Sequence, residues 1–187
     1  MTVSCAWSPD CYVDAYRFAA EAHRGQTVPG SNGLPYLMHV SMVAMEVMTA
    51  LAIEPFHAPD LAIQCALLHD TLEDTAVTED ELARRFGTAV AAGVRALTKD
   101  PALPAAERMA DSLRRIRGQT REVWIVKLAD RITNLQPPPG HWSPEKCRRY
   151  RDEASAIVTA LGSASPYLQR RMHDKIAAYP VEFAAPS

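Results

Sequence analysis

The chain has 187 residues, 48% of them hydrophobic, and its 20 basic and 22 acidic residues give a formal charge of −2. A chain of this length and apolar content can bury a sizeable core, so we expect residues 1–187 to form a single domain with a disordered tail at 181–187. The balanced charge, the lack of a long apolar run and four cysteines without a CxxC pair predict a cytoplasmic protein that binds neither nucleic acid nor membranes.

The first third of the chain predicts three helices. A serine–proline pair at Ser8 is typical of a helix start, and small apolar residues then recur at helical spacing over 10–24. After a loop rich in Pro and Gly, a second apolar pattern begins at Pro35 and carries His39 near its start. A third helix is expected over 59–71.

Two shorter helices are predicted next. Thr78 and Glu81 form a capping-box pattern that opens a helix, and that helix stops near Gly87. Another helix is expected over 88–97.

Three helices are predicted in the last third of the chain. Apolar residues over 125–135 follow helical spacing until three prolines at 137–139 end the helix. Serine–proline pairs at Ser143 and Ser165 mark the starts of the two last helices. Because no segment alternates with a period of two, we expect an all-α fold, a single compact helical bundle.

Four polar residues crowd the end of the third predicted helix, in the sequence LLHDTLEDT. On a helix, His69 and Glu73 lie four residues apart, as do Asp70 and Asp74, so their side chains would project from one sector. Like charges at this spacing repel each other, and a divalent cation removes the repulsion. His69 and Asp70 could supply two ligands, which leaves Glu73 and Asp74 to orient or deprotonate a water molecule.

Further ligands must come from elsewhere in the chain. Asp130 lies on the polar side of its predicted helix with Lys127 and Asn134, and His39 begins another helix. The plainer interpretation is that His69 is an ordinary hydrogen-bonded histidine and that the acids are solvated at a helix end. The residues by themselves leave both interpretations open.

Four stretches in a fixed order resemble a known family. They are GLPYLMHV with His39, CALLHDTLEDT with His69, FGTAVAAGVRALTKD, and VKLADRITNL with Asp130. Together they are similar to the HD-type hydrolase domain of SpoT/Rel proteins, above all to the small stand-alone alarmone hydrolases, from about Ala15 to Leu161. The resemblance implies the HD-domain fold and an enzyme that removes pyrophosphate from the 3′ position of (p)ppGpp.

The resemblance also implies a metal site. In this family two histidines and two aspartates hold one metal ion, usually manganese, which makes His39, His69, Asp70 and Asp130 the expected ligands. The chemistry of the donor set agrees, since two imidazoles and two carboxylates suit Mn, Fe or Zn better than Ca or Mg.

Roles for further residues follow from the same resemblance. Glu73 and Asp74 would be the catalytic acids that activate or position the attacking water. Asn134 would order the substrate ribose or the metal shell. Tyr150 matches a substrate-pocket tyrosine of the stand-alone members, although packing explains a tyrosine there equally well.

The match fails in two loops. Where guanine-alarmone hydrolases often have Arg-Arg-Lys-Asp before the first ligand histidine, this chain has Thr-Val-Pro-Gly at 27–30. The change removes the planar cationic groups that Arg offers to bases and phosphates. Where relatives tend to have Thr-Asp-Asp-Lys, the chain has Thr-Lys-Asp-Pro at 98–101, and Lys99 is interpreted as a solvated loop lysine.

Phosphate contacts are therefore expected from other basic residues, although such groups usually line a solvated helix face. The candidates are Arg24, Lys127 and the cluster of Arg148, Arg149 and Arg151.

The expected function is metal-dependent removal of the 3′-pyrophosphate from an alarmone nucleotide. The altered loop leaves (p)ppApp as compatible as (p)ppGpp. One alternative is an HD-superfamily phosphohydrolase that acts on the 2′-phosphate of NADPH or on a nucleoside monophosphate, although such families generally lack the Glu73–Asp74 pair. Another is a non-catalytic nucleotide-binding module, and a third is a structural bundle in which His69 and Asp70 form a buried pair that binds no metal.

Overall fold

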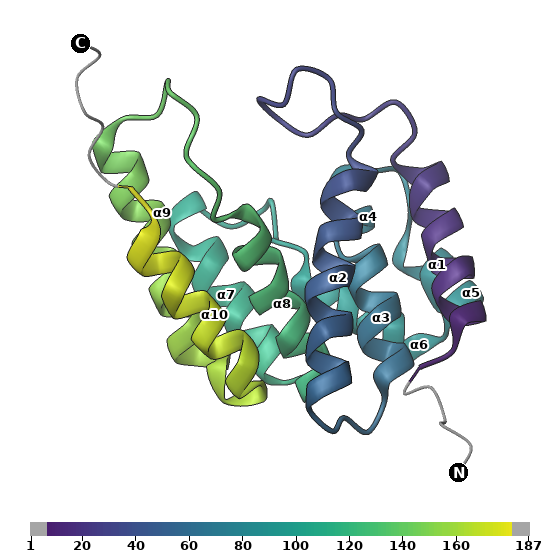
Figure 1. Ribbon diagram of the computed structural model, residues 1–187. Helices are drawn as coiled ribbons and strands as arrows, with labels where there is room; N and C mark the ends of the chain where they lie inside the picture. Colours follow the sequence, from purple (N-terminus) through teal and green to yellow (C-terminus); the bar gives the residue numbers. More distant parts are fainter. Residues whose placement is uncertain (1–6, 181–187) are drawn as a thin grey trace.

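The structure is a computed structural model that describes residues 7–180, and helices make up its regular structure apart from an isolated antiparallel bridge between Thr27 and Pro35 (Figure 1). The all-α class predicted from the sequence is confirmed. The helices are α1 (Pro9–Ala22), α2 (Leu37–Ile53), α3 (Pro59–Leu68), α4 (Thr71–Asp74), α5 (Glu79–Phe86), α6 (Thr88–Leu97), α7 (Ala105–Arg117), α8 (Arg121–Asn134), α9 (Pro144–Leu161), the short 3₁₀ helix η1 (Gly162–Ala164) and α10 (Pro166–Ala178).

Helices α2, α3 and α8 form the centre of the bundle (Figure 1). They pack against one another, while α1 and α6 cover α3, and α9 and α10 cover α8. The interface between α2, α3 and α8 is filled by fully buried aliphatic side chains. Burying each of them stabilises the fold by roughly 1.5–3 kcal/mol. Among them are Val43, Val47, Ile63, Ile125 and Ile132.

The predicted helix starts are confirmed. Ser8, Ser143 and Ser165 occupy the N-cap positions of α1, α9 and α10, and each hydroxyl oxygen accepts a hydrogen bond from the backbone N–H three residues later, at 3.1–3.4 Å. Thr78 caps α5 in the same way. Gly87 ends α5 with a φ of +90°, a backbone conformation that favours glycine.

Helix α3 is capped from another part of the chain, because its own N-cap residue, Ala58, has no polar side chain. The buried carboxylate of Glu122, at the start of α8, accepts hydrogen bonds from the backbone N–H groups of His57 and Ala58, both at 3.1 Å. A negative charge at a helix N-terminus is favourable. This contact fixes the start of α3 relative to α8.

Helix α3 ends earlier than predicted. It stops at Leu68, and α4 follows as a separate helix that begins at Thr71. At the break, the Thr71 hydroxyl donates to the Leu68 carbonyl oxygen at 2.7 Å, which satisfies a helix-end acceptor. The continuous helix expected through these four polar residues is therefore wrong, although all four side chains still line one cavity, with His69 buried and with Glu73 and Asp74 on the exposed turn of α4.

Helix α7 has no counterpart among the predicted elements. Its apolar residues Met109, Leu113 and Ile116 follow helical spacing and pack on the core. The guanidinium of Arg115 donates to three backbone carbonyl oxygens at the end of α6, at 2.7–3.1 Å. Contacts with α6 thus hold a helix whose sequence is mostly polar.

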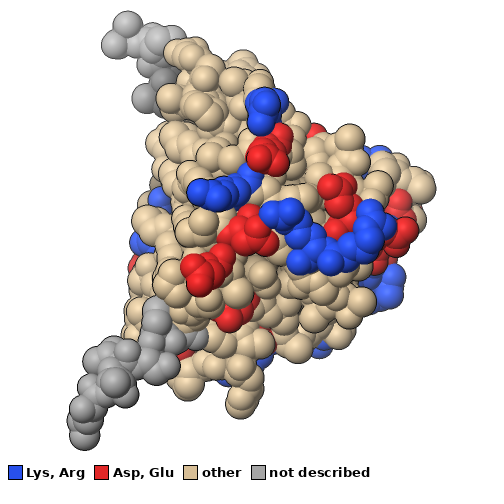
Figure 2. Space-filling model, turned by 90° about the vertical axis from the view of Figure 1, so that its right-hand side faces the viewer, with Lys and Arg blue, Asp and Glu red and all other residues tan. Residues whose placement is uncertain are grey.

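The surface carries basic and acidic side chains close together, as the face in Figure 2 shows. Arg85 of α5, for example, pairs with Asp14 of α1 at 2.6 Å. Within residues 7–180, no helix has both the length and the apolar character needed to cross a membrane. The tail predicted at 181–187 lies outside the described residues.

Candidate active site

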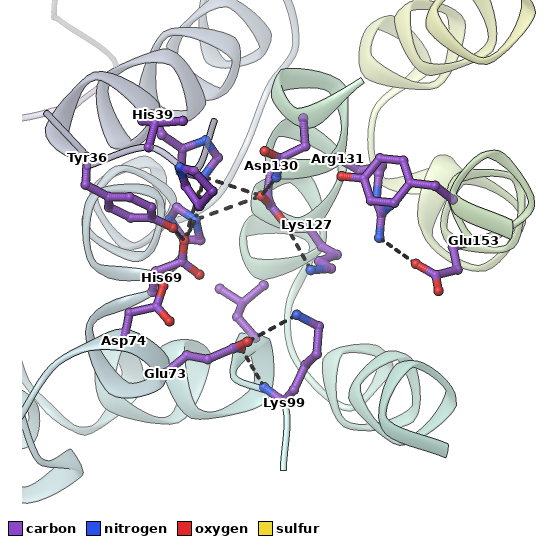
Figure 3. Close-up of a pocket in the computed structure, with 16 residues that line it drawn as sticks. Tyr36, His39, His69, Glu73, Asp74, Lys99, Lys127, Asp130, Arg131 and Glu153 are labelled. Carbon is purple, nitrogen blue, oxygen red and sulfur yellow. Dashed lines mark hydrogen bonds and ion pairs between the residues drawn. The ribbon is translucent and has the colours of Figure 1, made fainter. Parts of the chain in front are cut away.

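Four side chains from three parts of the chain converge beside α2, α3 and α8 (Figure 3). His39 lies near the start of α2, His69 and Asp70 lie between α3 and α4, and Asp130 lies in α8. The Nε2 atoms of the two histidines are 3.3 Å apart. Asp70 Oδ2 lies 2.8 Å from His69 Nε2, and Asp130 Oδ1 lies 3.6 Å from His39 Nε2. The structure therefore brings together the four residues expected to bind a metal.

The ring of His69 is oriented by the main chain. Its Nδ1 lies 2.9 Å from the carbonyl oxygen of Ala66. Because a carbonyl oxygen can only accept, Nδ1 carries a proton, and in the neutral ring Nε2 directs its lone pair toward the other three side chains. His39 also directs Nε2 at this point, and both histidines are buried.

Each aspartate is also held by neighbours. The hydroxyl of Tyr36 donates to Asp70 Oδ2 at 2.5 Å. Asp130 accepts from Lys127 Nζ on Oδ2 at 2.9 Å and from Asn134 Nδ2 on Oδ1 at 2.6 Å. Such contacts fix the direction of a ligating carboxylate.

The electrostatics of this cluster fit a divalent cation. Burial opposes the charged form of His69, yet the carboxylates of Asp70 and Asp130 outweigh burial and raise its pKa to about 9. Burial also opposes ionisation of Asp130, but Lys127 and His69 lower its pKa to about 2. The carboxylates thus favour a positive charge in a buried site. Donor atoms of His39, His69 and Asp70 all lie within 4.8 Å of one another, and this nitrogen–oxygen set suits a transition metal.

The two acids of α4 have different partners. The carboxylate of Glu73 accepts hydrogen bonds from the backbone N–H and from Nζ of Lys99, at 3.0 and 3.1 Å. The backbone carbonyl of Asp74 accepts from Gln26 Nε2 at 2.6 Å. Burial and the nearby carboxylates of Asp70 and Glu73 raise the pKa of the Asp74 carboxyl group, which brings it closer to the range of a general base.

The cluster lines a chamber of about 360 Å³. Three cationic side chains also line it, those of Lys99, Lys127 and Arg131 (Figure 3). The guanidinium of Arg131 pairs with Glu153 at 3.2 Å and lies 4.2 Å from the ring centre of Tyr150. Its Nη1 atom is buried and has no hydrogen-bond partner among the described residues. The chamber therefore combines acids, a metal-type cluster and cations that can bind phosphate.

An apolar groove of about 310 Å³ adjoins the chamber, with which it shares lining residues such as Val28, Asn134 and Tyr150. The ring centres of Trp142 and Tyr150 are 5.3 Å apart in an edge-to-face arrangement. The groove is lined by Val28, Pro29, Met38, His39, Met42, Thr133, Asn134, Gln136, Pro137, Pro138, Pro139, Trp142, Tyr150 and Tyr179.

The structure places the other candidate residues as follows. Glu73, Asp74, Lys127, Asn134 and Tyr150 line the chamber together with the four cluster residues. Exposed Arg24 instead lines a separate cavity that shares only Tyr36 with the chamber. The basic cluster on α9 does not line the chamber or the groove, and this cluster consists of Arg148, Arg149 and Arg151.

Several chamber residues were not singled out from the sequence or were interpreted differently. Lys99 was interpreted as solvated, yet it binds Glu73 within the chamber. Arg131 could have been predicted from the sequence. It lies four residues after Lys127 and three before Asn134, so all three side chains fall on the helical face that lines the chamber. Tyr36 and Glu153 had no such signal, since their roles depend on contacts with distant helices.

Comparison with known proteins places the chain in a family. The sequence model of the HD-domain family matches residues 15–166, which is most of the chain. The chain belongs to the HD-domain family. A guanosine-3′,5′-bis(diphosphate) 3′-pyrophosphohydrolase of Danio rerio is 34% identical over 164 residues, which cover 86% of this chain and 89% of the relative. The corresponding human protein is 32% identical over 164 residues with the same coverage.

A longer bacterial protein and a solved structure extend the comparison. A GTP pyrophosphokinase of Myxococcus xanthus is 34% identical over 163 residues, which cover 82% of this HD-domain chain but 20% of the relative. A solved structure of a metazoan ortholog of SpoT that hydrolyzes ppGpp superposes with a TM-score of 0.80 and 24% identity, and covers 94% of this chain and 98% of that one. The HD-domain fold, the resemblance to SpoT-type hydrolases and the enzyme class predicted from the sequence are confirmed.

Proposed function

We propose that this HD-domain protein removes the 3′-diphosphate, as pyrophosphate, from alarmone nucleotides of the (p)ppGpp or (p)ppApp type. The observation that carries the proposal is the convergence of His39, His69, Asp70 and Asp130 in one chamber with three further acids and three cations. Relatives named as guanosine-3′,5′-bis(diphosphate) 3′-pyrophosphohydrolases support the reaction.

In this proposal the four converging residues hold one divalent cation, and manganese suits their two imidazoles and two carboxylates. When bound, the cation supplies Lewis-acid stabilisation of phosphate charge and makes the attacking water more acidic. Hydrogen bonds already hold the rings and carboxylates of the cluster in place. Less conformational entropy is therefore lost when the four side chains bind the cation.

The hydrolysis forms one bond and breaks one. The oxygen of water attacks the phosphorus that is attached to ribose O3′, and the bond between that phosphorus and O3′ breaks. Asp74 takes the proton that water loses, in keeping with its raised pKa, and later releases it to solvent, while O3′ takes up a proton from solvent water and leaves as the 3′-hydroxyl. Lys99 and Lys127 stabilise the negative charge that builds up on the phosphoryl oxygens.

The groove beside the chamber suits the nucleobase. Its apolar and aromatic lining offers stacking to a flat ring, and Asn134, at the boundary with the chamber, suits contact with the ribose between base and phosphate. The loop residues Val28 and Pro29 form part of its wall and carry no hydrogen-bonding side chain that would select guanine over adenine. We therefore include both bases in the proposed substrate class.

A substrate panel tests the proposal. Purified protein with added Mn²⁺ is incubated with ppGpp, ppApp, NADPH and a deoxynucleoside monophosphate, and the products are resolved by ion-exchange chromatography. Pyrophosphate release from ppGpp or ppApp is the expected result. Turnover of NADPH or the monophosphate alone would favour the alternative phosphohydrolases, and tight binding of ppGpp without turnover would favour a non-catalytic module.

A further inference from the structure

One buried histidine has no part in the proposed reaction. His23 is the C-cap residue of α1, and only 4% of it is exposed. It lines neither the chamber nor the groove, but the separate cavity that Arg24 also lines. Because buried polar groups in proteins are held by partners, the contacts of His23 show what its ring is for.

The first partner of His23 is Gln26. The Asp74 carbonyl oxygen can only accept, so the Gln26 amide directs Nε2 to it at 2.6 Å and turns Oε1 toward His23. Oε1 lies 2.8 Å from His23 Nδ1, which therefore carries the proton and donates it. His23 Nε2 is buried without a hydrogen-bond partner among residues 7–180. The donor at Nδ1 thus fixes the orientation in which Gln26 holds the main chain of Asp74.

The second partner is Tyr36. The ring centres of His23 and Tyr36 are 4.9 Å apart, with 32° between their planes. The Tyr36 hydroxyl donates to Asp70 Oδ2 at 2.5 Å. Packing against the imidazole restrains the direction of the phenol ring. The His23 ring therefore stabilises the hydrogen bond from Tyr36 to Asp70.

The main chain joins the three residues into one unit. The backbone N–H of Gln26 donates to the carbonyl oxygen of His23, and that of Tyr36 donates to the carbonyl oxygen of Gln26, both at 3.0 Å. Gly25 has a φ of +79° in the turn between His23 and Gln26, a conformation that favours glycine. Because the backbone holds this turn, replacing the His23 side chain should remove its two contacts and leave the turn in place.

We infer that His23 is a positioning residue that holds Asp74 through Gln26 and Asp70 through Tyr36. One side chain outside the chamber then sets both the proton acceptor and a metal ligand of the site. This inference rests on the proposed function for the roles of Asp74 and Asp70.

Two substitutions separate the two contacts. His23→Phe keeps a ring but has no donor, and it is expected to lower kcat by about tenfold at saturating Mn²⁺ with KM unchanged, because Asp74 loses its anchor. His23→Asn keeps a donor near the place of Nδ1 but has no ring. It is expected to keep kcat within about threefold and to weaken Mn²⁺ binding by about threefold to tenfold, because Asp70 is held less firmly.

The control is His173→Phe, which replaces an exposed histidine on α10 and should change neither quantity. Wild-type kcat in His23→Phe, or wild-type Mn²⁺ affinity in His23→Asn, would overturn the inference. So would equal losses of kcat and of Mn²⁺ affinity in both variants, which is the result expected of a residue that only stabilises the fold.

A double substitution tests whether Gln26 carries the effect. His23→Phe combined with Gln26→Ala is expected to lower kcat no further than Gln26→Ala alone, within about twofold, because residues that act through one contact are not additive. If the two losses multiply, His23 does not act through Gln26 and the inference is overturned.

Hydrogen exchange separates this inference from the proposed reaction. Mass spectrometry of the peptide that spans α4 is expected to show about tenfold faster exchange in His23→Phe and near wild-type exchange in His23→Asn. If no 3′-diphosphate is hydrolysed but this pattern is found, the proposed reaction fails and the positioning of Asp74 by His23 stands. Unchanged exchange in His23→Phe would overturn the inference even in an active enzyme. His23→Leu, which also lacks a donor, repeats the measurement if His23→Phe does not fold.

Discussion

Lys99 binds both oxygens of the Glu73 carboxylate, through its backbone N–H at 3.0 Å and through Nζ at 3.1 Å. The neighbouring acid, Asp74, is held through its main chain instead, since its carbonyl oxygen accepts from Gln26. The two acids therefore differ in what their carboxylates are free to do. Glu73 keeps the Lys99 ammonium in the chamber, whereas the Asp74 carboxyl group has no lysine partner and its pKa is raised by burial and by its acidic neighbours, which suits it to take up a proton.

Substitution of each acid separates these roles. Asp74→Asn is expected to lower kcat by about a hundredfold or more, because it removes the proton acceptor. Glu73→Gln is expected to lower kcat by roughly tenfold, because Lys99, which stabilises the charge that builds up on the phosphoryl oxygens, loses its charged partner and moves out of position. Steady-state kinetics of both variants check this, and Lys99→Met should reproduce the effect of Glu73→Gln. A larger loss of kcat in Glu73→Gln than in Asp74→Asn would assign the base to Glu73.

Removal of a cluster carboxylate should release the metal. Asp130→Ala is expected to bind less than about a tenth of an equivalent of Mn²⁺ after dialysis, since a four-ligand site loses an anionic donor and its contacts to Lys127 and Asn134. Asp74→Asn is the control and should retain the wild-type amount. Elemental analysis measures both, and a metal-free wild type that added Mn²⁺ does not restore would support the purely structural bundle.

Gln26 should affect turnover without contacting the substrate. Its Nε2 donates to the Asp74 carbonyl oxygen at 2.6 Å, and its Oε1 lies 2.8 Å from Nδ1 of buried His23. Gln26→Ala is expected to lower kcat by about tenfold with KM and metal content unchanged, because the Asp74 main chain loses its anchor. Gln119→Ala, in the connection between α7 and α8 and outside the lining of the chamber, is the matched control. A fall in melting temperature with unchanged kcat would show that Gln26 acts only on stability.

Glu122 should stabilise the fold in a manner that depends on pH. Glu122→Ala leaves two part-buried backbone N–H groups at the start of α3 without an acceptor, at an expected cost of about 0.5–2 kcal/mol in the free energy of unfolding, as for the loss of a helix cap. Burial raises the pKa of Glu122, but hydrogen bonds from Thr120 and from the backbone outweigh burial and lower it below the ordinary 4.5.

The sign of the pH dependence follows from that lowered pKa. The contribution of Glu122 is fully present above the unfolded-state pKa and is lost as the pH falls through the lower folded-state pKa. Urea unfolding between pH 7 and pH 3 should therefore show the wild type losing its advantage over Glu122→Gln at the acid end. An advantage that stays constant over this range would contradict the assignment.

The helices that the sequence predicts best are those with start signals and apolar periods of their own, such as the segment that begins at Ser143. Helix α7 was missed because its residues are mostly polar, and it is held by Arg115 contacts with the end of α6. The break after Leu68 was missed for a similar reason. The local pattern continues as a helix, and the turn is set by tertiary contacts such as that of Asp70 with Tyr36.

For the site, the resemblance to the SpoT/Rel family selects His39, His69, Asp70 and Asp130, which the fold brings together, whereas residue type and spacing alone leave a metal site and an ordinary hydrogen-bonded pair both open. The position of Arg24 in the sequence could not show that it lines a different cavity, because that cavity forms only where the end of α1 meets the following loop in the fold. Nor could it show that Lys99 faces the chamber, since this depends on where α4 lies. Ion-pair partners from distant helices are the part of a site that a single sequence predicts least.

In the proposed reaction the residues of the chamber hydrolyse the bond between ribose O3′ and phosphorus. The most direct measurement is turnover of ppGpp in ¹⁸O-labelled water with Mn²⁺ present, followed by mass spectrometry of the products. Equal amounts of pyrophosphate and guanosine 5′-diphosphate are expected, with the label in pyrophosphate, and Asp130→Ala should show no turnover. Release of orthophosphate, label in the nucleoside product, or full activity of Asp130→Ala would contradict it.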